Sequence, residues 1–220
     1  MKEKFYTVVT IVMVCSAIVI MCLVLQKEFF KEDYNISNLQ YIYGWEKMVG
    51  IAGNAYQKGH DRAKVTVLLF FDYQCPYCKQ LNINLSKLYK KYADEIKISY
   101  LHRPIINPDF TYKIAVVSEC ARLQNNFKPF HDALFKEQML SDDISFTKLA
   151  NQTGANNLEK FSKCVEDEQT DDIVEGHIAL SNKLDINAVP TLIVNGRIIK
   201  GAASFEYLER IIQQILGENR

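Results

Sequence analysis

The sequence predicts an α/β protein in which helices cover a mixed β-sheet, with a helical insertion and, in front, one N-terminal transmembrane helix. Three observations support this prediction. An uncharged apolar segment lies near the N-terminus, strand-like runs occur in two separate regions, at 65–101 and 191–200, and the residues between them have helical periodicity.

Length and charge limit the classes of protein to consider. A chain of 220 residues is long enough for one well-packed domain. Its 26 Lys and Arg are balanced by 26 Asp and Glu, so nothing indicates electrostatic binding to nucleic acid. We divide the chain into a signal-anchor at 1–26, a connector at 27–60 and a domain at 61–220, whose helical insertion covers about 105–186.

The segment Phe5–Leu25 carries no charged residue. At ~1.5 Å per residue a helix of this length spans about 30 Å, the thickness of a bilayer core. A cleaved signal peptide is the alternative, but no good small-x-small cleavage site precedes Lys27. The lysines on the two sides balance, which leaves the positive-inside rule silent. Because a short N-terminal tail normally stays inside, we expect residues 27–220 outside the cytoplasm.

The connector at 27–60 mixes charged residues with aromatic ones such as Tyr41 and Trp45. We expect it to pack on the body of the domain as a helix or strap. The alternative is a tether that also self-associates.

A β–α–β unit follows. Val65–Phe71 is an almost unbroken run of apolar strand formers, as expected for a strand buried on both faces. Pro76 suits the first turn of a helix, and apolar residues then recur at helical spacing from Leu81 to Tyr92. Ile96–Leu101 alternates as a second strand, so we expect the two strands to be parallel.

The remaining elements are helices and one hairpin. Residues 110–184 have helical periodicity throughout. Thr191–Val194 and Arg197–Lys200 are predicted strands, joined by Asn195-Gly196, a strong hairpin signal. Ser204 is placed to cap a last helix.

Cys75 and Cys78 form a Cys-x-x-Cys pair at the start of the first helix. A structural zinc site needs four ligands, and the sequence offers no second close pair of Cys or His, so we expect no metal. A structural clip would close too short a loop to stabilise the fold much. Redox chemistry fits best, because a helix N-terminus favours a thiolate. We expect Cys75 to be exposed and attacked by substrate, and Cys78 to be the buried resolving thiol.

The stretch AVPTLIVNG places Val189-Pro190 directly before a strand. With the Cys-Pro-Tyr-Cys motif and the long insertion between the two, the chain resembles DsbA-like thiol:disulfide oxidoreductases of the thioredoxin superfamily over roughly 60–217. The resemblance implies a thioredoxin-like sheet and a cis bond at Val189-Pro190 that faces the cysteines. It also implies Cys75 as the nucleophile and Cys78 as the resolving thiol.

The chain departs from the family at several positions. Leu69 stands where many members have an acid, and Asp72 either substitutes for that acid or caps the strand end. Pro76 and Tyr77 fix the turn between the cysteines without a countercharge, whereas many DsbA oxidases have histidine at the position of Tyr77. We therefore expect a less oxidising protein than DsbA, whose potential is about −120 mV. Val189 resembles the oxidases, since isomerases more often have threonine there.

Cys120 and Cys164 lie on apolar helical faces of the insertion. We expect them to form a structural disulfide, because an oxidising compartment leaves them as the remaining pair of the soluble part. Two buried free thiols, or a second redox relay, are the alternatives. His131 is expected to be a satisfied structural histidine.

The first hypothesis is therefore a membrane-tethered oxidoreductase that introduces disulfides into exported proteins without a cofactor. It would lie at the inner membrane with its catalytic domain in the periplasm or extracytoplasmic space. Its partners would be reduced exported proteins and, as the resemblance implies, a DsbB-like quinone-coupled membrane oxidase. The second hypothesis is an isomerase or reductase of the same fold, oligomeric through the N-terminal region. The third is a non-enzymatic binding module, which the intact cysteine pair disfavours.

Overall fold

The computed structural model describes residues 13–21, 37, 39–137 and 145–218, and the chain forms two units, Met1–Asn35 and Ile36–Arg220. In the first unit, residues 13–21 are helical. The rest of the predicted transmembrane segment Phe5–Leu25 lies outside the described residues. Within the part that is described, no helix combines the length and the apolarity needed to cross a bilayer. The transmembrane helix therefore stays a prediction.

The second unit is built around a five-stranded mixed sheet with the strand order β1-β3-β2-β4-β5. Strands β2 and β3 are parallel, and the other neighbouring pairs are antiparallel. The strands are Tyr56–Lys58 (β1), Val65–Phe71 (β2), Ile96–His102 (β3), Thr191–Val194 (β4) and Arg197–Lys200 (β5). The predicted mixed sheet is confirmed. Strand β1, at the end of the predicted connector, was not foreseen.

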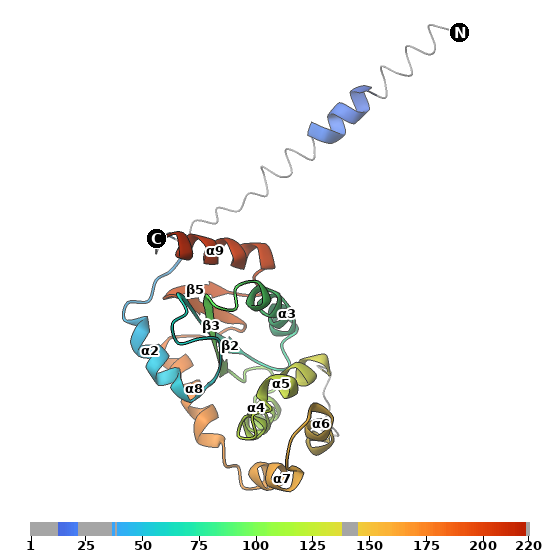
Figure 1. Ribbon diagram of the computed structural model, residues 1–220, viewed down its shortest axis with the longest axis vertical. Coiled ribbons are helices and arrows are strands. Elements are labelled where there is room, and N and C mark those ends of the chain that lie inside the picture. The colour runs from blue at the N-terminus through green and yellow to red at the C-terminus, as the bar shows by residue number, and fades with distance from the viewer. Residues whose placement is uncertain (1–12, 22–36, 38, 138–144, 219–220) are drawn as a thin grey trace, which may run out of the picture. The chain divides into compact units, whose positions relative to one another are not determined.

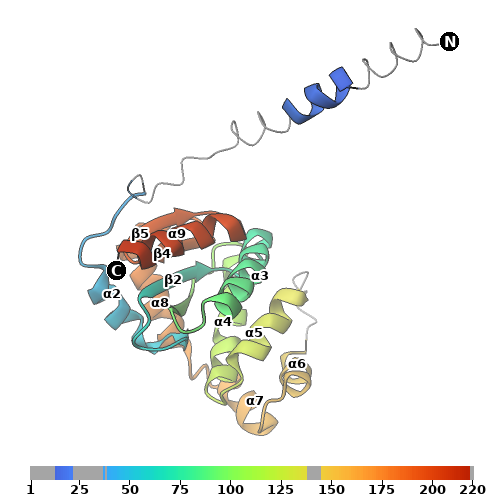
Figure 2. The ribbon, with the colours of Figure 1, turned by 45° about the horizontal axis from the view of Figure 1, so that its top comes forward.

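Helices cover both faces of this sheet (Figures 1 and 2). The alternation along β2 explains the two layers. Val67 and Leu69 belong to the same core cluster as α3 and α9, whereas Leu68 and Phe70 pack with residues of α8 and of the short helices before β1. Because β2 is central and buried on both faces, its sequence reads as a continuous apolar run.

Helix α3, Pro76–Lys91, crosses from β2 to β3 and buries Leu81, Leu85 and Leu88 against the sheet. The parallel register runs from Val65 opposite Ile96 to Phe71 opposite His102. The C-terminal ends of β2 and β3, and the N-terminus of α3, therefore meet at one edge of the sheet.

The predicted helical insertion has five helices between β3 and β4 among its described residues, 105–137 and 145–186. They form a lobe beside the sheet, with α8 packing back onto it (Figure 1). The helices are Pro108–Arg122 (α4), Phe127–Lys136 (α5), Phe146–Thr153 (α6), Leu158–Glu166 (α7) and Asp171–Lys183 (α8). The last helix, Phe205–Glu218 (α9), follows the hairpin and begins where Ser204 Oγ accepts from the Tyr207 amide at 3.1 Å.

The described part of the connector packs on the hairpin between β4 and β5. Asn195 and Gly196 both have positive φ, at 43° and 82°, which a two-residue hairpin turn requires. A Cβ on Gly196 would lie 2.6 Å from Cδ1 of Trp45 in helix α2 (Trp45–Ile51), so only glycine fits there. The 3₁₀ helix η2, Ala52–Asn54, follows α2. The expectation that the connector packs on the body is confirmed for these residues.

Candidate active site

Cys75 lies at the junction between β2 and α3. Its amide donates to the carbonyl of Asp72 at 3.2 Å, and its own carbonyl accepts from the amides of Cys78 and Lys79. Cys75 has extended backbone angles and Pro76 follows as the first helical residue. Cys75 is therefore the N-cap of a 16-residue helix, where the helix dipole favours a negative sulfur.

The two thiols have opposite acid strength. A hydrogen bond from the Cys78 thiol is the largest influence on Cys75 and lowers its pKa to about 6, helped by backbone N–H groups of Cys78 and Tyr77. Burial and the charge of Asp72 oppose this shift without cancelling it. For Cys78, burial foremost raises the pKa far above its usual value. At neutral pH the reduced pair is a Cys75 thiolate beside a Cys78 thiol, which is the division expected for a nucleophile and a resolving partner.

The expectation that Cys75 is exposed is wrong. Cys75 and Cys78 each expose only 2% of their surface. The reason is a segment remote in sequence, since Sγ of Cys75 lies 3.6 Å from the carbonyl oxygen of Val189. Tyr77, by contrast, is 66% exposed and marks the open side of the motif.

The peptide bond between Val189 and Pro190 is cis. Strand β4 begins at the next residue, and Thr191 pairs with Phe70 of β2. This register carries Val189-Pro190 to the sheet edge where Cys75 lies. The hydroxyl of Thr191 donates to the carbonyl of Ala188 at 2.8 Å and so fixes the turn. The structure thus brings the sequence-predicted residues Cys75, Cys78, Val189 and Pro190 close together.

Asp72 holds the turn that precedes Cys75. Its buried carboxylate accepts from the amides of Gln74, Ile105 and Ile106, each at 2.8 Å. Burial raises the pKa of Asp72 and these hydrogen bonds oppose the rise. The strand-end cap considered from the sequence is therefore present, and it also ties the active-site turn to the segment after β3. Leu69, which stands where many family members have an acid, lies in the core.

Cys120 and Cys164 form a disulfide that joins α4 to α7. This is the pairing expected from the sequence, and both sulfurs are buried. Because the bond lies within the insertion, it leaves Cys75 and Cys78 as the remaining thiols of the described second unit.

His131 is a structural histidine, as expected. Its Nδ1 lies 3.0 Å from the hydroxyl of Tyr73, and its Nε2 lies 3.3 Å from Oδ1 of Asn82. Burial lowers its pKa well below the usual value, so the ring is neutral. A single tautomer then satisfies both contacts, with Tyr73 donating to Nδ1 and Nε2–H donating to Asn82.

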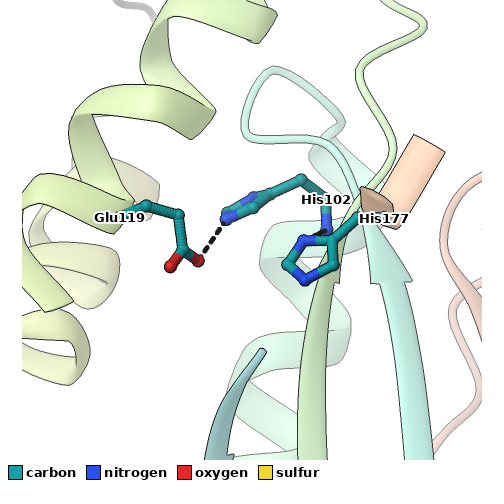
Figure 3. A group of neighbouring side chains, drawn as sticks. All are labelled: His102, Glu119 and His177. Carbon is teal, nitrogen blue, oxygen red and sulfur yellow. Dashed lines mark hydrogen bonds and ion pairs between the residues drawn. The ribbon is translucent and has the colours of Figure 1, made fainter. Parts of the chain in front are cut away.

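Sequence reasoning missed a second polar cluster, formed by His102, Glu119 and His177 (Figure 3). Nε2 of His102 lies 2.9 Å from Oε1 of Glu119, and the amide of His102 donates to Nδ1 of His177 at 3.3 Å. Arg122 also donates to Glu119. A lone glutamate in the otherwise apolar stretch IAVVSECA was the only signal available in the sequence.

The donor atoms of this cluster are close enough to hold a metal ion, within 4.8 Å of one another. However, the Glu119 carboxylate already has two hydrogen-bonding partners, His102 and Arg122. Burial alone would raise its pKa, but the hydrogen bond from His102 and the charges of His102 and Arg122 outweigh burial and lower it. The geometry is therefore that of a buried polar network that links β3, α4 and α8 through hydrogen bonds.

A mixed sheet, a helical insertion and a cysteine pair opposite a cis-proline define the class of thioredoxin-fold proteins. A family model described as thioredoxin matches residues 52–214, and the chain belongs to this family. It is similar to disulfide bond formation protein D of Bacillus subtilis, with 30% identity over 175 residues, 72% of this chain and 75% of the relative.

Solved structures agree with this assignment. BdbD from Bacillus subtilis superposes with a TM-score of 0.68 at 27% identity, covering 75% of this chain and 94% of BdbD. The catalytic domain of Proteus mirabilis ScsC has the same fold, with a TM-score of 0.69 at 21% identity and coverage of 81% and 99%. The protein is accordingly a DsbA-like protein thiol:disulfide oxidoreductase.

Proposed function

We propose that the protein introduces disulfides into exported polypeptides through the Cys75–Cys78 pair. The observation that carries this proposal is the pKa of Cys75, lowered to about 6 beside a buried Cys78 thiol. A stabilised thiolate favours the reduced form of the enzyme, and an enzyme that prefers to be reduced oxidises its substrate.

The reaction starts from the Cys75–Cys78 disulfide. A substrate thiolate attacks Sγ of Cys75, the Cys75–Cys78 bond breaks, and Cys78 leaves and takes up a proton. A second substrate thiolate then attacks the substrate sulfur of the mixed disulfide and expels Cys75 as a thiolate. Two electrons pass from substrate to enzyme, the substrate gains a disulfide and the enzyme ends as a dithiol. A low pKa makes Cys75 a good leaving group in the second step.

Val189 and Pro190 supply the platform for the substrate. The Val189 carbonyl faces Cys75 Sγ, and Val189 is only half-buried. A substrate segment that adds as a short strand beside Val189 would hold its cysteine at the attacked sulfur. Binding there also requires the contact that covers Cys75 to open.

The second candidate function uses the same cysteine pair in a different direction, as a reductase or isomerase. A Cys75 pKa of about 6 lies between the ~3.5 of DsbA and the ~7 of thioredoxin, so it favours an intermediate potential. An isomerase or reductase, oligomeric through the N-terminal region, is the alternative that such a potential allows.

The cellular setting completes the proposal. Residues 1–26 would anchor the chain in the inner membrane, and the enzyme would act in the periplasm or extracytoplasmic space. Reduced exported proteins would be its substrates, and a DsbB-like quinone-coupled membrane oxidase would reoxidise it. The uncharged segment Phe5–Leu25 supports the anchor.

Redox titration against glutathione buffers tests the proposal. We expect a potential between about −120 mV and −270 mV, together with oxidation of a reduced model protein. A potential at or below the thioredoxin value would exclude the oxidase and leave the reductase. Cys75→Ser is the control and should abolish the reaction.

A further inference from the structure

A groove of about 460 Å³ lies between α3 and α5, on the helix that carries the cysteine pair. Both ribbon views place α5 beside α3 (Figures 1 and 2). The apolar side chains that line the groove are Ile83, which is 44% exposed, and Phe135, which is buried. Ile83 lies one turn beyond Lys79, and Lys79 directly follows Cys78.

Four lysines surround this apolar lining. Lys79, Lys87 and Lys90 come from α3 and Lys136 from α5. The single carboxylate of the lining, Asp132, already accepts from Asn82 at 3.0 Å and pairs with Lys128. The groove is therefore strongly basic although the chain as a whole has a net charge of zero.

The walls of the groove are fixed. Lys79 Nζ donates to the carbonyl of Lys136 at 3.3 Å and so links the two helices. Asn82 joins Asp132 to the buried His131, which in turn contacts Tyr73 near the cysteine pair. A preformed groove costs a partner less ordering entropy than one that must assemble on binding.

Further lysines extend the same positive face. Burial lowers the pKa of Lys58, the neighbouring charges of Lys128 and Lys90 lower it further, and the charge of Asp132 opposes this shift. Lysines this close repel one another, so an anionic partner would relieve an unfavourable interaction already present in the free protein.

We propose that this groove binds an acidic, amphipathic segment of the polypeptide substrate, whose apolar side chains contact Ile83 and Phe135 while its carboxylates pair with the lysines. The inference rests on the proposed function, because it takes the substrate to be a polypeptide held at Cys75. From Cys78 to Lys90 the helix rises about 18 Å, the length of roughly five extended residues. A concave apolar lining favours a peptide over the flat anionic surface of a membrane.

Reduced model peptides with two cysteines test this inference on the full-length enzyme with a glutathione redox buffer. Three peptides share one sequence except for the flanking segments, which carry Glu-Leu, Gln-Leu or Lys-Leu repeats. We expect kcat/KM to fall about tenfold from the Glu-Leu to the Lys-Leu peptide at low salt. The difference should shrink in 0.5 M NaCl, where surface charges are screened.

Charge reversal supplies the matched comparison. Lys87→Glu/Lys90→Glu should invert the order of the peptides. Lys160→Glu/Lys163→Glu changes two exposed lysines with the same spacing on α7 and should keep the wild-type order.

The possible failures are distinguishable. If the wild type oxidises none of the peptides, the proposed function falls and the inference with it. If it oxidises all three at equal rates, the function stands and the groove inference is overturned. A last outcome concerns acetylation of Lys87 and Lys90 by a chemical reagent. If phosphatidylglycerol vesicles protect these lysines and the Glu-Leu peptide does not, the groove inference is overturned and the lysine face is assigned to the membrane.

Discussion

Cys75 and Cys78 are one helical turn apart, yet the pKa of one thiol is lowered and that of the other is raised. The difference comes from position rather than residue type. Cys75 receives hydrogen bonds from Cys78 and from the first amides of α3, whereas Cys78 is dominated by burial. The chemistry of the site therefore depends on which sulfur accepts the hydrogen bond between the two thiols and which sulfur donates it.

Removing the Cys78 donor tests this relation. Cys78→Ala should raise the pKa of Cys75 by one unit or more from about 6, because the hydrogen bond from Cys78 is its largest cause. Cys78→Ser retains a hydroxyl donor and should raise it less. The ultraviolet absorbance of the thiolate, followed against pH, gives the midpoint of the titration. Equal midpoints in both variants and the reduced wild type would contradict the assigned role of Cys78.

Glu119 predicts a pH dependence of stability. Its pKa is lower in the folded protein than the ordinary value of 4.5. The stabilisation from its ionised form is therefore present above about pH 4.5 and is lost as pH falls through the folded-state pKa. Glu119→Gln should lower the free energy of unfolding by about 3 kcal/mol near pH 7, since it leaves His102 and Arg122 without their carboxylate.

Urea unfolding from pH 7 to pH 3 measures this dependence. The gap between wild type and Glu119→Gln should narrow as the pH falls. The exposed Glu166→Gln on α7 is the control and should stay within about 0.5 kcal/mol of wild type. A gap that stays constant over the range would show that loss of packing, not of charge, is responsible.

At the scale of elements, the strands and helices follow closely from local pattern. Strands β2, β4 and β5 have the predicted bounds, and β3 extends one residue further, to His102. The three-residue strand β1 escaped prediction because it is short and lies at an edge, where pairing with β3 supplies the order that its own sequence lacks.

The insertion is held together by its disulfide, and this gives a prediction on stability. Cys120 and Cys164 are 44 positions apart, a loop for which cross-linking stabilises a fold by about 2–4 kcal/mol. Cys120→Ser/Cys164→Ser should lower the free energy of unfolding by that amount, as measured by urea unfolding. A Cys75→Ala/Cys78→Ala background prevents exchange with the active-site pair. If dithiothreitol leaves the stability of that background protein unchanged, the bond contributes nothing.

At the scale of the whole molecule, the N-terminal segment and the catalytic unit serve separate purposes in the proposed function. The active site, the cis-proline and the groove all belong to the second unit, Ile36–Arg220. Anchoring would raise the effective concentration of the enzyme at the membrane without altering the chemistry at Cys75.

Membrane fractionation checks the anchor. The full chain should remain in the membrane pellet after extraction at alkaline pH, and deletion of residues 1–26 should release it into the supernatant. The released protein should keep its activity toward reduced peptides. Recovery of a shortened chain in the soluble fraction of wild-type cells would instead support a cleaved signal peptide.

The sequence alone determined most of the elements, though not β1, and the kind of chemistry. A continuous apolar run predicts a buried central strand, and a Cys-x-x-Cys pair after it predicts a redox site, because both depend on neighbours in the chain. The resemblance of Val189-Pro190 to a family element placed the second half of the site. These parts were predictable because their signals are local in sequence or carried by a short motif.

Only the tertiary structure decided what surrounds those residues. It covers Cys75 with the Val189 carbonyl, ties Asp72 to Ile105 and Ile106, and buries Glu119 between His102 and Arg122. It also brings Ile83 of α3 and Phe135 of α5 to one lysine-rimmed groove. Each of these contacts joins side chains or loops whose separation is set by packing, and the burial and charge of a residue follow from that packing rather than from its neighbours in the chain.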